Sequence, residues 1–215
     1  ERFRMPVGEE VILAGAMLGV LVSYDYVRRT GLDHPEYYPL MLLATTGAMV
    51  MAGAGDLIVL LLGLEITSLS VYVLSAWRQG DPQSEEAGMK YFLLGAFASA
   101  FLIYGIALAY GATGTFGYDG IAAALTADGF ASLLLATLAG ALVLVGLGFK
   151  AALVPFHQWA PDAYTGAPTS VTTFMSVVVK AGAFAALLRI AASFMPEMAP
   201  VLTELFAWMV ALTMV

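Results

Sequence analysis

The chain contains three lysines, and each lies inside an apolar segment instead of a loop. They are Lys90 in GMKYFLLGAFASAFLIYG, Lys150 in LVLVGLGFKAALVPF and Lys180 in FMSVVVKAGAFAALL. Glu65, in LIVLLLGLEITSLSVYV, is placed in the same way and has the opposite charge. A charged side chain at bilayer depth costs at least about 2.5–3.5 kcal/mol on insertion scales, and such residues usually serve a function. The four residues therefore predict a charge or proton pathway through a membrane.

The composition indicates an integral membrane protein built from helices. Of 215 residues, 60% are hydrophobic and only 12% are charged, whereas soluble domains carry about 25% charged residues. The chain has no cysteine, which excludes disulfides, iron–sulfur clusters and thiolate zinc sites on it. His34 and His157 are too few and too far apart to bind haem or a metal by themselves. No basic run points to nucleic acid, so we expect no cofactor, no metal and no nucleic acid on this chain.

Apolar segments of suitable length predict an all-α, polytopic transmembrane helix bundle. A bilayer core of about 30 Å takes roughly 20 helical residues to cross. The predicted spans cover about 11–28, 38–55, 56–77, 83–110, a segment from 130, 168–194 and a segment from 199. Asp81 and Pro82 have the residue types of an N-cap and a first helical position. The arginine-bearing loops 29–37 and 78–82 are expected on the cytoplasmic side.

The fifth apolar segment, residues 130–160, is too long for one span. Its 31 residues would reach about 46 Å as a continuous helix, and it contains Gly148, Pro155 and Pro161. Proline removes a backbone donor and clashes with the preceding turn. Broken helices at membrane depth persist only where they are buried in protein or line a cavity, and in transporters they mark ion or substrate sites. We therefore predict a helix break around Gly148 and Pro155, with Pro155 five residues after Lys150.

The burial of these lysines suggests proton chemistry. A lysine in an apolar environment holds its proton less firmly than in water, and a nearby carboxylate favours the charged form. A buried lysine with a movable acidic partner can thus load and release a proton, which arginine cannot do because it stays protonated.

Structural roles remain open for each of these residues. The Lys90 side chain could reach the membrane surface, Lys150 and Lys180 could only fix helix packing, and Glu65 could be a neutral packing group. His157 is either a further relay residue or a plain hydrogen-bonding residue.

Other polar residues suggest packing and turns. Gly95 and Ser99 lie four residues apart, a spacing typical of close helix contacts. Asp162 stands between Pro161 and the GAP turn at 166–168, and we expect it to act as a turn or capping residue.

The segment FKAALVPFHQWAPDAYTGAPTSVTTFMS, residues 149–176, resembles the signature of the antiporter-like membrane subunits of respiratory complex I and of Mrp-type cation/proton antiporters. SEEAGMKYFLLGAFASAFLIYG, residues 84–105, looks most like the N-type subunits of bacterial NADH-quinone oxidoreductase. The resemblance covers roughly residues 40–195.

The resemblance implies a fold of fourteen helices built around two inverted five-helix repeats. Residues 1–37 would form a first transmembrane helix and its loop, 38–195 the first repeat, and 196–215 the start of a further helix in a chain that we expect to be truncated. Within this pattern a glutamate pairs with a lysine on the broken helix, and a central lysine follows on the next helix. Glu65, Lys150 and Lys180 match these positions, and Lys90 matches an additional lysine of N-type subunits.

The implied function is proton translocation along this Glu/Lys relay, driven by quinone reduction elsewhere in a bacterial inner-membrane complex. Flavin, iron–sulfur clusters and quinone are then expected on partner subunits, and the partners would include further antiporter-like subunits. One alternative is a subunit of a multisubunit cation/proton antiporter without redox chemistry. Another is a scaffold subunit whose charges only hold helices together.

Overall fold

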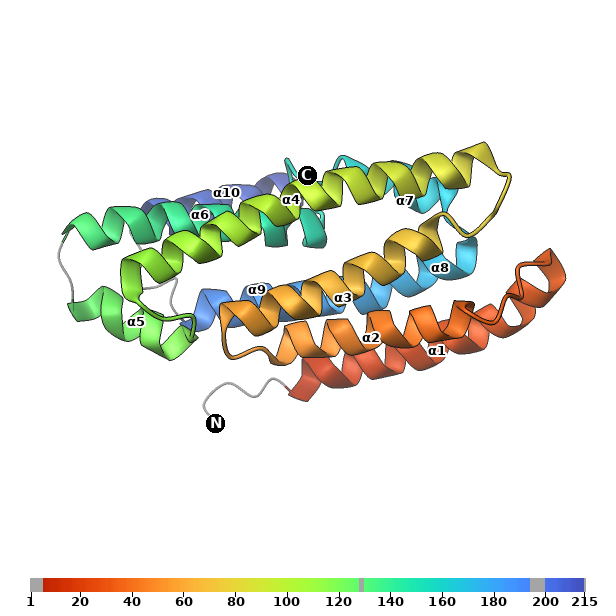
Figure 1. Ribbon diagram of the computed structural model, residues 1–215, viewed down its shortest axis with the longest axis horizontal. Helices are drawn as coiled ribbons and strands as arrows, with labels where there is room; N and C mark the ends of the chain where they lie inside the picture. The colour runs from red at the N-terminus through yellow and green to blue at the C-terminus, as the bar shows by residue number, and fades with distance from the viewer. Residues whose placement is uncertain (1–5, 128–129, 194–199, 215) are drawn as a thin grey trace.

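The computed structural model describes residues 6–127, 130–193 and 200–214, and these form a bundle of helices joined by short loops (Figure 1). The elements are α1 (Pro6–Thr30), α2 (Tyr37–Gly53), α3 (Leu57–Ser75), α4 (Pro82–Thr113), α5 (Tyr118–Ala127), α6 (Phe130–Ala151), α7 (Trp159–Gly166), α8 (Thr169–Phe174), the π-helical turn Met175–Val179, α9 (Lys180–Ser193) and α10 (Pro200–Thr213). The predicted all-α transmembrane fold with a broken helix is confirmed.

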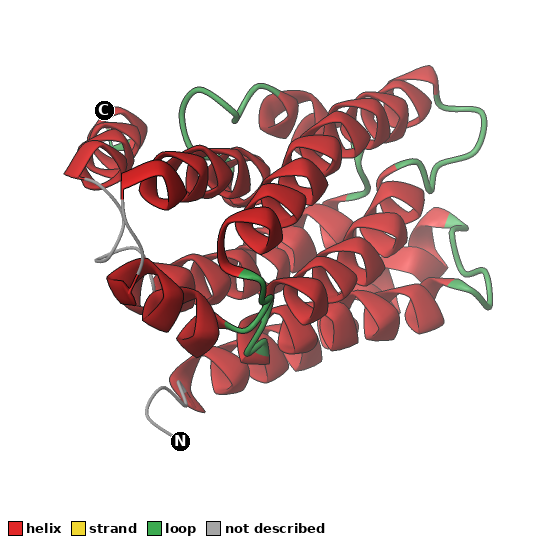
Figure 2. Ribbon diagram, turned by 60° about the vertical axis from the view of Figure 1, so that its left-hand side comes forward, coloured by secondary structure: helices red, strands yellow, loops and turns green. Residues whose placement is uncertain are grey.

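The helices lie roughly parallel to one long axis in three layers. Figures 1 and 2 show α4, α6, α7 and α10 on one side and α1 and α2 on the other, with α3, α8 and α9 between them. This layering places α3 in contact with α4, which also packs along α6. The four ionisable residues are thus carried by elements that touch one another.

Five helical segments within the described ranges are long and apolar enough to cross a membrane. They are Gly8–Thr30, Leu57–Ser75, Pro82–Thr113, Leu134–Ala151 and Thr169–Ser193. The remaining predicted spans correspond to α2 and α10, which have 17 and 14 residues. The predicted boundary between residues 195 and 196 lies outside the described residues, so the division into 1–37, 38–195 and 196–215 stays a prediction.

Aspartates begin two of the long helices. The Asp56 carboxylate accepts hydrogen bonds from the backbone N–H groups of Ile58 and Val59 at 2.9 and 2.8 Å. Asp81 accepts from Gln83 N at 3.1 Å and is followed by Pro82 in the first turn, which confirms the predicted start of α4. Each cap satisfies backbone donors that have no partner inside the helix.

Small residues allow the long helices to approach one another closely. A Cβ atom on Gly63 of α3 would lie 2.5 Å from Met51 N and 2.8 Å from Gly47 O of α2. A Cβ on Gly146 of α6 would lie 2.6 Å from Leu102 Cβ of α4. Close backbone approach of this kind is typical of helix contacts in lipid, where burial of apolar surface gives little driving force. These glycines fix how far α3, α4 and α6 stand from one another.

The break after α6 is confirmed, and it begins with a known helix-ending motif. Ala152 has a φ of 57°, and its N–H donates to Phe149 O at 3.0 Å. Leu153 N donates to Gly148 O at 2.8 Å. This pair of bonds is the Schellman ending of a helix, here with alanine where glycine is usual. Gly148 therefore lies inside α6 and accepts one of its closing bonds, while Pro155 lies in the break itself.

Replacing Gly63 by valine should destabilise the fold by about 1–3 kcal/mol, because the added side chain collides with the α2 backbone. The measurement is the thermal unfolding midpoint of the purified protein in detergent. Gly111→Ala is the matched control: it is also a helical glycine, with no atom within 4 Å of its added Cβ. That control should be neutral or stabilising, since alanine favours helix by up to about 1 kcal/mol. An unchanged midpoint for Gly63→Val would contradict the close α2–α3 contact.

Candidate functional site

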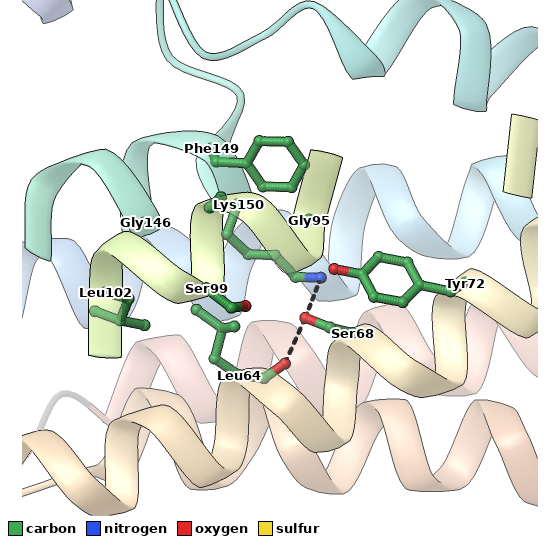
Figure 3. Close-up of a pocket in the computed structure, with 10 residues that line it drawn as sticks. Leu64, Ser68, Tyr72, Gly95, Ser99, Leu102, Gly146, Phe149 and Lys150 are labelled. Carbon is green, nitrogen blue, oxygen red and sulfur yellow. Dashed lines mark hydrogen bonds between the residues drawn. The ribbon is translucent and has the colours of Figure 1, made fainter. Parts of the chain in front are cut away.

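The Lys150 side chain is the centre of the buried polar site. It extends from the last turn of α6 toward α3 and α4 and is only 1% exposed. Its Nζ donates to Ser68 Oγ at 2.9 Å (Figure 3). It also donates to Tyr91 OH at 3.3 Å. The ring centroids of Tyr72 and Tyr91 lie 5.5 and 5.2 Å from Nζ, within the range of cation–π attraction. Neutral hydroxyls and aromatic faces therefore surround this ammonium.

Ser68 connects the ammonium to the α3 backbone. Its hydroxyl donates to Leu64 O at 2.6 Å, so its lone pairs are free to accept from Lys150 (Figure 3). Ser68, Tyr72 and Tyr91 were not predicted as site residues. A usable signal was present, because Ser68 and Tyr72 follow Glu65 by three and seven residues and so share its face of α3.

Glu65 lies beside the Lys150 site without a salt bridge to it. Its Oε1 accepts a 2.6 Å hydrogen bond from Ser99 Oγ of α4, and the residue is partly buried. Among the described residues, no salt bridge within 4 Å joins Glu65 to Lys150. The expected Glu65–Lys150 pairing is therefore not a direct contact here.

A small pocket lies beside Lys150 and reaches Ser99, the residue that binds Glu65. Lys150, Ser68 and Ser99 are among its lining residues, and the space is too narrow for a water molecule. Gly95 also lines it, and a Cβ there would collide with the Tyr72 hydroxyl. The packing role predicted for Gly95 is confirmed. For Ser99 the prediction was incomplete, since its hydroxyl binds Glu65.

Lys180 binds the end of the broken helix. Its Nζ donates to Ala151 O at 2.9 Å, and it lies 5.1 Å from the Trp159 ring centroid. Ala151 is the last residue of α6, where carbonyls lack partners within the helix and the helix dipole favours a cation. The π-helical turn Met175–Val179 ends directly before Lys180, and such turns are frequent at functional sites. Lys180 thus caps α6 at Ala151, the residue that follows Lys150 in the chain.

Lys90 lies apart from this site. Its Nζ is 2.7 Å from Glu86 Oε1 and 2.8 Å from Asp162 Oδ2, and its side chain is 43% exposed. The turn or capping role expected for Asp162 was wrong: it lies in the first turn of α7 and pairs with Lys90. His157 is exposed within the break, and its relay role stays a prediction. In the described part of the chain, no group of His, Asp or Glu side chains is arranged to hold a metal ion.

The chain matches a known family of membrane proteins. The family model described as NADH:quinone oxidoreductase/Mrp antiporter, TM, matches residues 54–215. The chain belongs to this family. It is 52% identical over 185 residues to NADH-quinone oxidoreductase subunit N 1 of Sorangium cellulosum, covering 84% of this chain and 36% of the relative. Subunit N of Moorella thermoacetica is 46% identical over 206 residues, covering 95% of this chain and 43% of the relative. These similarities confirm the resemblance to subunit N.

Chains in solved structures share the fold. A chain of respiratory complex I from Thermus thermophilus with bound aureothin gives a TM-score of 0.75 at 45% identity, over 96% of this chain and 42% of that one. A chain of the archaeal membrane-bound sulfane sulfur reductase gives a TM-score of 0.78 at 35% identity, over 94% of this chain and 40% of that one. A chain of the Mrp complex from Dietzia sp. DQ12-45-1b gives a TM-score of 0.71 at 28% identity, over 88% of this chain and 35% of that one. The chain spans about two fifths of the length of the curated relatives above, 36% and 43%.

Replacing Ser68 by alanine should cost about 1–3 kcal/mol of stability, because it removes a hydrogen-bond partner of a fully buried ammonium. Ser70→Ala is the matched control, since the Ser70 hydroxyl bonds only to Ile66 O of its own helix; it should cost no more than about 0.5 kcal/mol. Denaturant or thermal unfolding in detergent measures both. Equal losses for the two variants would show that the Lys150 contact contributes nothing.

Proposed function

We propose that this chain belongs to a proton-translocating N-type membrane subunit of bacterial NADH-quinone oxidoreductase, in the inner membrane. The observation that carries the proposal is the fully buried Lys150, bound by neutral hydroxyls beside a helix break and near Glu65. Support for the complex comes from the 45–52% identity to subunit N of Sorangium and Moorella relatives and to a Thermus complex I chain. Partners would be other membrane subunits of the complex, including antiporter-like ones.

The partners of Lys150 suit a group that gains and loses a proton. A hydroxyl can accept a hydrogen bond from an ammonium and can equally donate to a neutral amine. The Tyr91 hydroxyl can therefore accept from the ammonium or donate to the neutral amine. Ser68, whose own proton is donated to Leu64 O, can accept from either form, because a neutral amine still has N–H donors. A fixed carboxylate partner would favour only the ammonium. In this proposal Lys150 is the proton holder, and its two hydroxyl partners keep it in place through the cycle.

Glu65 supplies the charge that changes how firmly Lys150 holds its proton. A unit charge moved to 4 Å interacts by about 4 kcal/mol at an effective dielectric of 20. Glu65 is tethered to α4 through Ser99, so a relative movement of α3 and α4 alters its distance from Lys150. Approach of Glu65 loads the proton, and withdrawal releases it.

Lys180 is the residue that we propose receives the proton from Lys150. It lies at the Ala151 carbonyl, one residue along the backbone from Lys150. The pocket at Lys150 has no room for water in this conformation, so transfer requires an opening movement. Quinone reduction in partner subunits, which would carry the flavin and iron–sulfur clusters, is the proposed source of that movement. The lysines of this chain would hold and pass the proton without redox chemistry of their own.

A second candidate function is cation/proton exchange without a redox partner. The observation in its favour is the shared fold with the Mrp complex of Dietzia at 28% identity. The higher identity to subunit N relatives favours the first candidate. A scaffold role, in which the buried charges only hold helices, is tested by the same variants.

Lys150→Met and Glu65→Gln should each lower NADH-driven proton uptake into inverted membrane vesicles by about tenfold or more, a loss that needs only ~1.4 kcal/mol of added barrier. The proton loses its holder in the first variant and its electrostatic switch in the second. Glu204→Gln, at an exposed carboxylate on α10, is the control and should pump normally. Assembly is checked by co-purification from mild detergent with flavin- and iron–sulfur-bearing subunits. Normal pumping in both site variants would support the scaffold role instead.

Removing sodium should leave NADH-driven proton uptake unchanged if the first candidate is correct. The same vesicles are assayed in potassium and in sodium buffers, with and without NADH. Proton movement that needs sodium and proceeds without NADH would establish the cation/proton antiporter. Lys150→Met vesicles provide the control for leakage through the membrane.

A further inference from the structure

Lys90, Glu86 and Asp162 form a charged cluster outside the Lys150 site. Glu86 lies one turn before Lys90 on α4, the favourable order for an ion pair within a helix. Asp162 comes from α7, 72 residues later in the chain. The three side chains line a cavity of about 180 Å³ between the two helices.

The short helix α7 depends on α4 for its position. It follows the break at 152–158 and precedes Ala167 and Pro168, so neither end continues a long helix. At its C-terminal end, Gly166 lies against Gln83 O and Ala87 of α4, where any Cβ would collide. Near its N-terminal end, the Lys90–Asp162 ion pair supplies the polar link to α4. Figure 1 shows α7 alongside the N-terminal half of α4.

The first residue of α7, Trp159, connects this ion pair to Lys150 and Lys180. The Trp159 ring stacks on Tyr91 with centroids 4.1 Å apart and planes at 3°. Its Nε1 donates to Phe149 O at 2.9 Å, and its ring lies 5.1 Å from Lys180 Nζ. Because Tyr91 itself binds Lys150, a shift of α7 displaces groups that contact both lysines.

We infer that Lys90 is a positioning residue: its ion pair with Asp162, here called the ionic latch, holds α7 on α4 and thereby sets the Trp159–Tyr91 stack that flanks Lys150 and Lys180. This role differs from the relay role that the resemblance implies for Lys90. Its effect on pumping rests on the proposed function, whereas the docking of α7 does not.

The test compares removal of the latch with its replacement by an apolar pair, in the full-length subunit within its complex. The variants are Lys90→Met, Asp162→Leu and the double variant. A hydrophobic pair can replace an ion pair without loss of packing, but it cannot carry a proton. The charge swap Lys90→Glu with Asp162→Lys serves as a second rescue.

Docking is measured by thiol cross-linking, since this chain contains no cysteine. Gln83→Cys on α4 and Thr165→Cys on α7 both face the cavity and are exposed, so a short bifunctional maleimide can join them. Lys90→Met and Asp162→Leu should each slow cross-linking about two- to fivefold, the change in rate that corresponds to the free energy of an exposed ion pair. Both double variants should return cross-linking and proton uptake to within about twofold of the parent. Glu86→Gln, which removes only the partner within α4, is the matched control and should cross-link normally.

The outcomes separate the latch from a proton-carrying role. Cross-linking at the parental rate in both single variants would overturn the inference. So would an apolar double variant that cross-links normally and does not pump, because Lys90 would then be needed as an ionisable group. If Lys150→Met pumps normally while the latch variants still loosen α7, the latch stands and the proposed function fails.

Discussion

The burial of the Lys150 ammonium is the constraint on which the surrounding structure depends. A buried charge costs several kcal/mol unless hydrogen bonds replace its water. Within the described residues, no carboxylate lies in salt-bridge range of Nζ, so α3 and α4 must each deliver a hydroxyl, from Ser68 and Tyr91. That delivery requires α4 to lie close to α3, which the missing side chain of Gly95 permits. The hydrogen bonds of Lys150 therefore depend directly on the spacing of α3 and α4.

The ending of α6 solves a second problem, which is the exposure of backbone carbonyls at membrane depth. Lipid offers no hydrogen bonds, so a break persists only where protein supplies partners. The Schellman bonds use the carbonyls of Gly148 and Phe149, Trp159 Nε1 adds a bond to Phe149 O, and Lys180 takes Ala151 O. Lys180 and the Trp159 ring beside it therefore also supply hydrogen bonds that stabilise the break.

Much of this arrangement was predictable from the sequence, and the remainder was not for physical reasons. Ionisable residues in apolar segments and prolines in an overlong span are local signals, and they indicated Glu65, Lys150, Lys180 and the break. The partner of Lys180 is a backbone carbonyl, a group that every residue has and that no sequence pattern singles out. The π-helical turn Met175–Val179 is apolar like its neighbours and has no local mark. The choice of Ser68 over Glu65 as the contact of Lys150 depends on helix rotations that tertiary packing sets.

The two lysines connect the last turn of α6 to different helices. Lys150 ties it to α3 and α4, and Lys180 ties the next residue, Ala151, to α9. A movement of this turn therefore changes the contacts of both ammonium groups together. In the proposed relay this coupling has a direct consequence. A movement of the last turn of α6 that breaks the Lys150–Ser68 hydrogen bond also shifts the Ala151 carbonyl that Lys180 binds. Release by one lysine and rearrangement at the other become parts of one conformational step, with no separate connection between the sites.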